Sequence, residues 1–388
     1  MSAQSLLSSV HGSIRRVLFT VPYWVLRYGH QVEIHPYKQA YEALLTLLPE
    51  RAERVVVTHA EAEVEAADWL EALGVGARSR VLAVPDDDEF TVWAQDACVV
   101  QDSSDGGSLL VAPSSFDRHD DASVMKQSSD HLGLEHRRCD LSFQGGNVLV
   151  GDDFWLLGED AIRQTLLHGL ADDSSAAGLR FAALDADRTL HVVRSKLTTS
   201  GPSSRPLEES DGGEGRAWQE VIHTGNHDGS SQPLFDLDGF ISLAGRGDDG
   251  MYRLLVGDPR MAAEITRTPL LDHALADVFD DVAAGLSSRG FRIIRNPLPL
   301  SSHDDPVLRT RRWYFASSNN VVSEIDGDTK TVWLPSYGEA DYPELQATDR
   351  HNEEIWRQLG FDVRPLPSFH VFARGLGAAH CICKCLSR

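Results

Sequence analysis

The residue best suited to nucleophilic chemistry in this sequence is Cys381, which follows His380 after a run of small residues, Gly377-Ala378-Ala379. A thiolate is a strong nucleophile, but a free thiol has a pKa of about 8.5 and needs nearby positive charge to ionise at neutral pH. Cys383 and Cys385 follow in alternation, which suggests a soft-metal site. Because no Cys-x-x-Cys pair exists to complete a zinc site, we favour a nucleophile and expect no metal.

Acidic side chains stand where they would face a cation. Asp236 and Asp238 lie in an apolar stretch, 233–244, that we interpret as a strand, so a period of two places both carboxylates on one face. Two acids in such a strand are costly unless they face water, a metal or another cation. Asp96 ends a Trp93-Ala94-Gln95-Asp96 motif, which alone is better explained as a surface acid beside a core Trp.

Three further motifs follow predicted strands. Gln144-Gly145-Gly146-Asn147 allows close approach of the backbone and, taken alone, indicates a turn. Ser317-Ser318-Asn319-Asn320 and Leu334-Pro335-Ser336-Tyr337-Gly338 belong together in a later unit of the chain.

The elements that must position these residues form a weak internal repeat. In each of four units a helical pattern leads to a glycine and then a short alternating strand, at 74–85, 133–145, 290–299 and 360–367. Helices are expected at 60–73 and 354–359, and further strands at 109–112, 148–157 and 332–335. A fifth, more degenerate unit is expected at 190–260. Such units cannot bury their apolar faces alone, so we expect about five of them to close into a ring whose loops meet at one channel.

Taken in order, these motifs resemble a known family. The WAQD, GGN, acid-pair, SSNN, LPSYG and terminal HC motifs are similar to those of the agmatine deiminase and protein-arginine deiminase branches of the guanidine-modifying superfamily. The similarity runs from about 93 to 385. It implies a single α/β domain over 1–388, built as a pseudo-fivefold propeller of ββαβ modules around a central channel.

The resemblance also implies roles for particular residues. Cys381 matches the nucleophile, and Asp96 and Asp238 match two acids that hold the guanidinium. The same motifs place Trp93, Gly146, Asn147 and Asn320 at the substrate. The reaction implied is deimination through a covalent cysteine intermediate, giving a ureido product and ammonia without a cofactor. Transfer of the amidino group to an amine is the sibling reaction.

One position departs from the family pattern. The family has a histidine two residues before the second acid, where this chain has Asp236. Imidazole donates a proton to the leaving amine and then activates water, which a carboxylate does poorly unless its pKa is raised.

Three explanations of this departure stay open. Asp236 marks a slow enzyme or a binding protein for guanidines or arginine peptides, or it was introduced to trap a substrate, or another histidine supplies the proton. The candidates are His223, His227 and His380; adjacent strand residues point to opposite faces, so we expect His380 to face away from the site.

The composition of the chain limits which partners the protein can bind and where in the cell we expect it. The 388 residues carry a net charge of −22, which repels nucleic acid and anionic membranes. No apolar run approaches the roughly 20 residues that span a bilayer. Five cysteines and no recognisable signal peptide favour reduced thiols in the cytoplasm. The Ser-, Gly- and acid-rich stretch 198–215 is expected to be a mobile insertion. We expect a small-molecule or peptidyl guanidino substrate, and a homodimer is left open.

Overall fold

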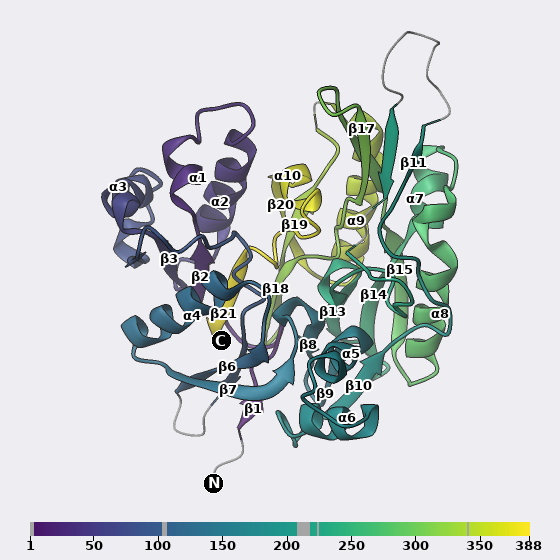
Figure 1. The fold of residues 1–388 in the computed structure, drawn as a ribbon, viewed down its shortest axis with the longest axis horizontal. Coiled ribbons are helices and arrows are strands. Elements are labelled where there is room, and N and C mark those ends of the chain that lie inside the picture. Colours follow the sequence, from purple (N-terminus) through teal and green to yellow (C-terminus); the bar gives the residue numbers. More distant parts are fainter. Residues whose placement is uncertain (1–3, 103–106, 208–217, 223–224, 340) are drawn as a thin grey trace.

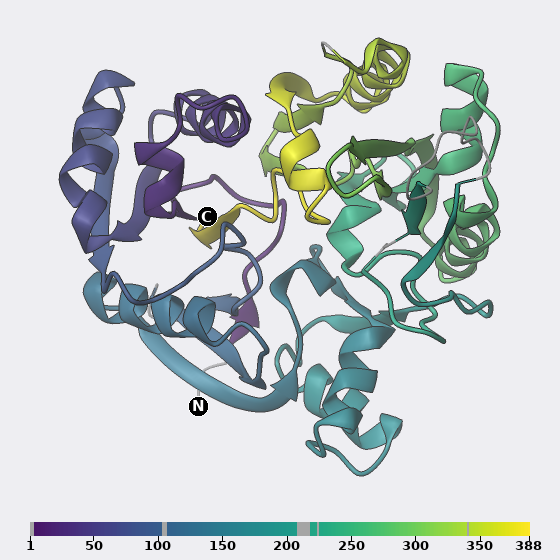
Figure 2. The same ribbon diagram turned by 45° about the horizontal axis from the view of Figure 1, so that its top comes forward.

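The strands of the described residues are divided among six small sheets. A computed structural model describes residues 4–102, 107–207, 218–222, 225–339 and 341–388 (Figure 1). Within these residues no sheet closes on itself, and each sheet has three or four strands. The fold is therefore a mixed α/β arrangement of separate sheets with helices at their outer sides (Figure 2).

Five of the six sheets share one connectivity, in which an antiparallel pair of strands is followed by one or two helices and a strand that returns parallel to the second. In two of these sheets the elements are β5 (Val99–Asp102), β6 (Ser108–Ser115), α4 (His119–Leu132) and β7 (Glu135–Ser142), then β8 (Val148–Val150), β9 (Phe154–Gly158), α5 (Glu159–Leu167), α6 (Ser174–Ala182) and β10 (Thr189–Val193). Two others contain β13 (Ile241–Arg246), β14 (Tyr252–Asp258), α7 (Pro259–Thr266), α8 (Ala276–Ser287) and β15 (Arg292–Pro297), then β18 (Val322–Asp326), β19 (Thr329–Ser336), α9 (Gln346–Gln358) and β20 (Asp362–Ser368).

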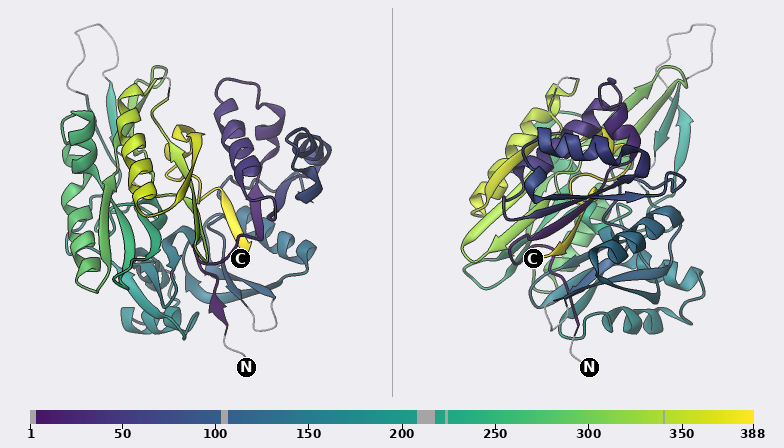
Figure 3. Two further views of the ribbon diagram at one scale, coloured as in Figure 1. Left: turned by 180° about the vertical axis from the view of Figure 1, so that it is seen from behind. Right: turned by 90° about the vertical axis from the view of Figure 1, so that its left-hand side faces the viewer.

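The fifth of these sheets joins the two ends of the described chain. Its strands are β21 (Cys383–Ser387), β2 (Arg16–Thr20), β3 (Glu53–His59) and β4 (Ser79–Val84), and its helices are α1 (Tyr23–Arg27), α2 (His35–Leu47) and α3 (Glu63–Ala72). Strand β21 runs antiparallel to β2 (Figure 3). The short strand β1 (Ser5–Leu6) pairs with β5, and the short helix α10 (His370–Ala373) precedes β21.

Apolar patterning explains these elements. The consecutive valines of β3, Val55, Val56 and Val57, are fully buried, as expected of a strand covered on both faces. Helix α8 buries Val278, Phe279, Val282, Ala283 and Leu286 at helical spacing. No helix in the described parts of the chain is long and apolar enough to cross a membrane.

The predicted repeat is confirmed in its strands. The four predicted units end in β4, β7, β15 and β20, and each of these strands follows a helix. The predicted helices correspond to α3 and α9, and the predicted further strands to β6, β8, β9 and β19. The fifth unit was wrongly bounded: β10 belongs to the β8–β9 sheet, whereas β13 and β14 share a sheet with β15.

The sixth sheet contains part of the predicted insertion. It consists of β11 (Ser203–Pro206), β12 (Gln219–Ile222), β17 (Thr310–Phe315) and β16 (Leu300–Asp305). Residues 203–206 are exposed and pair with β12. Residues 208–215 of the predicted insertion lie outside the described residues.

Candidate active site

Five loops bring the predicted site residues together, and each loop directly precedes the first strand of one of the five related sheets. Asp96 precedes β5, Gly146 and Asn147 precede β8 in a 3-10 turn (Gly145–Asn147), and the acid pair precedes β13. Asn320 precedes β18, and Cys381 precedes β21. Because the five sheets share one connectivity, equivalent loops contribute one part of the site each.

Asp96, Asp236 and Asp238, here called the acid cluster, are all buried, with exposed fractions of 4%, 7% and 2%. The Oδ1 atom of each carboxylate is buried and has no hydrogen-bond partner. Buried polar atoms are almost always paired, so three orphaned oxygens in one place indicate a missing donor. Among the described residues no three His, Cys, Asp or Glu side chains are placed to hold a metal ion.

Gly146 allows the two acids of the pair to converge. A Cβ atom built on Gly146 would lie 2.8 Å from Asp236 Oδ2 and 3.0 Å from Asp238 Oδ2. Any other side chain at this position would displace the carboxylates, so the glycine of the GGN motif serves close approach to the acids.

The acid pair reaches this position without the predicted strand. Leu237–Gly239 forms a 3-10 turn with Asp236 at its N-cap, and β13 begins only at Ile241. The prediction that both acids lie in one strand was wrong, because the buried Leu234, Leu237 and Phe240 imitate an apolar strand while the backbone turns. Burial first, and then the charges of Asp96 and Asp238, raise the pKa of Asp236 well above its ordinary value.

The thiol of Cys381 lies beside the acid cluster, in a turn at 378–382 that we call the cysteine turn. Its Sγ atom is 3.5 Å from Asp238 Oδ2 and 3.0 Å from Asn320 Nδ2, which donates to it. The side-chain is buried, and burial together with Asp238, Asp96 and Asp236 raises the pKa of the thiol well above its ordinary value. A cation that neutralises the acids would lower that pKa.

Asn320 organises the cysteine turn through a single oxygen. Its Oδ1 atom accepts hydrogen bonds from the backbone N–H groups of Ala378, His380 and Cys381 at 3.0, 2.9 and 3.1 Å. Because Asn320 is fully buried, this side chain holds the shape of the turn as well as contacting the thiol.

Backbone hydrogen bonds connect the loops to one another. Gln95 N donates to Cys381 O at 3.1 Å, and Gly145 N donates to Asp96 O at 2.9 Å. Behind them the buried Lys384 donates from Nζ to the backbone oxygens of Gln95 and Cys98. The positions of Asp96 and Cys381 are therefore coupled.

Trp93 and Asn147 lie at the edges of the site. A Cβ atom on Gly377 would come within 2.5 Å of the Trp93 ring and 3.0 Å of Cys381 Sγ, so the indole packs against the cysteine turn across this glycine. Asn147 Oδ1 accepts a hydrogen bond from Gln232 Nε2 at 3.1 Å, which joins it to the loop before the acid pair.

Arg118 is a site residue that the sequence did not reveal. Its guanidinium donates to Asp96 Oδ2 and lies 3.1 Å from Asp121. It leaves Asp96 Oδ1 unpaired. Burial raises the pKa of Asp96 even though Arg118 opposes that rise. Arg118 follows β6 without any motif, so only its proximity in space could identify it.

The candidate histidines occupy different places. His227 Nε2 lies 3.2 Å from Asp160, and His227 lines a cavity of about 100 Å³ together with Asn147 and Asp236. His223 lies outside the described residues. His380 was predicted to face away, but its Nδ1 atom is 2.7 Å from Asp238 Oδ2. That prediction failed because His380 lies in the cysteine turn and not in a strand, which begins at Cys383.

Comparisons with known proteins agree with this fold. No protein-family model and no curated protein sequence matches the chain. Among solved structures it is similar to the agmatine deiminase of Enterococcus faecalis, with a TM-score of 0.62, 11% identity and coverage of 98% of this chain and 95% of that one. A C. jejuni agmatine deiminase gives the same values. A Porphyromonas gingivalis protein assigned as an arginine deiminase gives 0.66 and 14%, covering 98% and 97%. The resemblance seen in the motifs is thus confirmed as a likeness of fold over nearly the whole chain.

Proposed function

We propose that this protein is a hydrolase that deiminates a guanidino compound, giving a ureido product and ammonia. The observation that carries the proposal is the acid cluster, in which three buried carboxylates each present an unpaired oxygen close to a buried thiol. A guanidinium is a flat cation whose N–H groups suit carboxylates through paired, charge-assisted hydrogen bonds. Thus Asp96, Asp236 and Asp238 hold the cation, and Cys381 attacks its central carbon.

The chemistry balances without a metal or an oxidant. The thiol loses its proton, and a carbon–sulfur bond forms as one carbon–nitrogen bond breaks. The thiol proton leaves with the departing nitrogen as ammonia, and a cationic S-alkylthiouronium remains on Cys381. Water then breaks the carbon–sulfur bond, gives the ureido product, returns a proton to sulfur and releases one proton, which ammonia takes up. The bound cation itself favours the thiolate, because it offsets the acids that raise the pKa of Cys381.

Asp236 makes the reaction slow in this proposal. A side chain at this position must give a proton to the leaving amine and take one from water. With its pKa raised by burial and by two neighbouring acids, Asp236 holds a proton at higher pH than an ordinary carboxyl. Even so, a carboxyl lodged between two carboxylates exchanges its proton less readily than an imidazole near its own pKa.

The surroundings of Asp236 suit a small substrate better than a peptide. It lines a cavity of about 100 Å³ and an adjoining one of about 20 Å³. Phe116, Phe143 and Phe235 contribute apolar walls. Such dimensions accept a guanidino group and a short chain. We also propose that the five related sheets are modules of one propeller domain and that the protein works in the reducing cytoplasm, which the five cysteines of its sequence support.

A product assay tests the proposal. The protein is incubated with agmatine, arginine and an arginyl peptide, and ureido product and ammonia are measured. We expect slow formation of both from at least one small guanidine and loss of both in Cys381→Ala. We expect retention in the matched control Cys385→Ala, whose thiol lies in β21, the strand that follows the cysteine turn. Absence of product from every donor, or equal activity in Cys381→Ala, would refute the hydrolase.

A non-catalytic guanidine-binding protein is the second candidate, favoured by the carboxyl at position 236. It requires that guanidines stabilise the protein against heat equally in the natural protein and in Cys381→Ala, with no covalent adduct on sulfur. Amidino transfer is separated from hydrolysis by adding an acceptor amine and following the amidino group.

A further inference from the structure

His380 stands between the nucleophile's acid partner and a second cavity. Its Nδ1 atom is 2.7 Å from Asp238 Oδ2, and the same oxygen is 3.5 Å from Cys381 Sγ. One carboxylate oxygen therefore contacts the thiol on one side and the imidazole on the other. The arrangement is a continuous path for a proton from sulfur to nitrogen.

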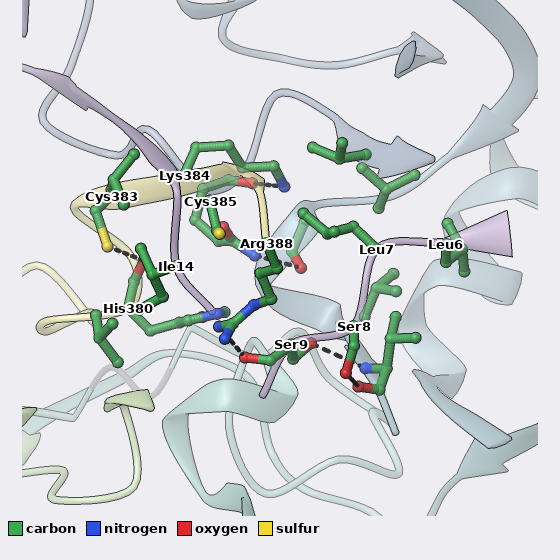
Figure 4. Close-up of a pocket in the computed structure, with 18 residues that line it drawn as sticks. Leu6, Leu7, Ser8, Ser9, Ile14, His380, Cys383, Lys384, Cys385 and Arg388 are labelled. Carbon is green, nitrogen blue, oxygen red and sulfur yellow. Dashed lines mark hydrogen bonds between the residues drawn. The ribbon is translucent and has the colours of Figure 1, made fainter. Parts of the chain in front are cut away.

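His380 also lines cavities that are separate from those lined by Asp236. His380 lines a cavity of about 50 Å³ together with Cys383, Lys384, Cys385 and Arg388 (Figure 4). A smaller one of about 20 Å³ is lined by both His380 and Asp238. Asp236 lines neither of these two cavities. The larger rear cavity has room for a few water molecules.

The charged groups around this rear cavity are engaged elsewhere. Lys384 donates to the backbone oxygens of Gln95 and Cys98. Arg388 donates to four backbone oxygens, those of Ser9, Val10, Gly12 and Ser323. Burial raises the pKa of both Cys383 and Cys385, which keeps these thiols neutral. Asp238 is thus the acidic partner within hydrogen-bond distance of His380, whose side chain is 15% exposed while that of Asp238 is 3% exposed.

We propose that His380 is a positioning residue that exchanges the proton of Cys381 through Asp238. Its imidazole, on the opposite side of Asp238 from the thiol, does the work of the imidazole that position 236 lacks. The proposal rests on the proposed function. With His380 in the tautomer that carries its N–H on Nε2, Nδ1 is free to accept a proton. The S–H bond breaks as Asp238 Oδ2 accepts its proton, and Asp238 passes that proton to His380 Nδ1, leaving a thiolate and an imidazolium. After attack the proton returns through Asp238 to the departing nitrogen. No co-reactant is needed, since the proton only changes its carrier.

A pair of substitutions isolates the imidazole from its hydrogen bond. His380→Asn keeps a side-chain N–H near Asp238 but cannot titrate, and His380→Gln is the second variant if His380→Asn does not fold. The first readout needs no substrate: the rate at which iodoacetamide alkylates Cys381, followed by mass spectrometry across a range of pH. We expect His380→Asn to slow alkylation about tenfold at mildly alkaline pH, the change that one pKa unit makes in the thiolate fraction. Overlapping profiles would overturn the proposal.

The second readout separates proton exchange from a structural role. Turnover is measured in the natural protein, His380→Asn, Asp236→His and the double variant. We expect His380→Asn to lower turnover at least tenfold alone, but less than twofold in the Asp236→His background, where an imidazole at 236 carries the proton. Equal loss in both backgrounds would show that His380 only supports the turn, and would overturn the proposal. If no variant turns over, the proposed function fails while the alkylation profiles still decide the role of His380.

Discussion

The two halves of the candidate site differ in how well their polar atoms are paired. In the cysteine turn, Asn320 alone accepts three backbone N–H groups and contacts the thiol. In the acid cluster, each of three carboxylates keeps one unpaired, buried oxygen. The first half is complete without a ligand, and the second is not. This contrast supports the proposal that the turn is a scaffold and that the acids bind the cation.

The largest effect, on turnover, is expected from placing an imidazole in the acid cluster. Asp236→His removes one of three crowded acids and adds a group that exchanges protons near neutral pH. We expect turnover on a small guanidine to rise by roughly 10²–10⁴-fold. Steady-state assays of ureido product measure it, with Asp236→Asn as the control that removes charge without adding an imidazole. An equal gain in both variants would mean that the charge, and not the missing base, limits the reaction.

The next effect concerns the scaffold half. Asn320→Ala removes the acceptor of three backbone N–H groups, and each buried unsatisfied donor costs about 1–3 kcal/mol. We expect the free energy of unfolding to fall by about 3 kcal/mol or more, measured by urea denaturation. Asn147→Ala, which loses one side-chain hydrogen bond, to Gln232, is the matched comparison and should lose about 1 kcal/mol. Similar losses of unfolding free energy in the two variants would show that Asn320 is not the scaffold of the cysteine turn.

A smaller effect is expected from occupying the acid cluster without reaction. Millimolar guanidinium should speed alkylation of Cys381 about tenfold, because a cation between the acids lowers the raised pKa of the thiol by about one unit. Tetramethylammonium at the same ionic strength is the control, since it cannot donate hydrogen bonds. Protection of Cys381 by guanidinium, instead of acceleration, would place the cation directly against sulfur.

The smallest effect is on the pH dependence of stability. The folded protein keeps a proton on Asp236, whose pKa is raised, under conditions where the unfolded chain has already released it. The free energy of unfolding therefore falls as pH rises above the unfolded pKa of about 4 and stops falling above the folded pKa. In Asp236→Asn the fall of the free energy of unfolding with pH should become shallower, by the amount that one fewer bound proton gives. The exposed Asp249 is the comparison, because a hydrogen bond from Arg292 lowers its pKa. Substituting Asp249 should change the pH dependence of the free energy of unfolding in the opposite direction.

Local patterns predicted much of the fold. Strands β7, β15 and β20 alternate in the sequence and follow a helix and a glycine, so nearest-neighbour chemistry sets them. The order of motifs likewise predicted which loops would meet at Cys381. Which strands share a sheet was less visible, because β10 pairs with β9 across the two intervening helices α5 and α6, whereas β13 pairs with the next strand, β14.

The predictions that failed at the site concern residues that are placed by backbone turns or by contacts between positions far apart in the sequence. The acid pair was assigned to a strand because its apolar neighbours are buried, although a 3-10 turn places them. His380 was assigned to the wrong face for the same reason: strand alternation does not apply within a turn. Arg118 contacts Asp96 across 22 positions of sequence, and no local pattern encodes that ion pair.

The pairing of β21 with β2 can form only after β21, the last described strand, has been synthesised. Strand β2 (Arg16–Thr20) emerges from the ribosome early, whereas its antiparallel neighbour, and the thiol just before it, emerge only after every other described element. Until then one side of β2 is an open edge, able to pair with other chains. Under the proposed function, a nascent chain halted before residue 381 has the acids without the nucleophile and does not deiminate a guanidine.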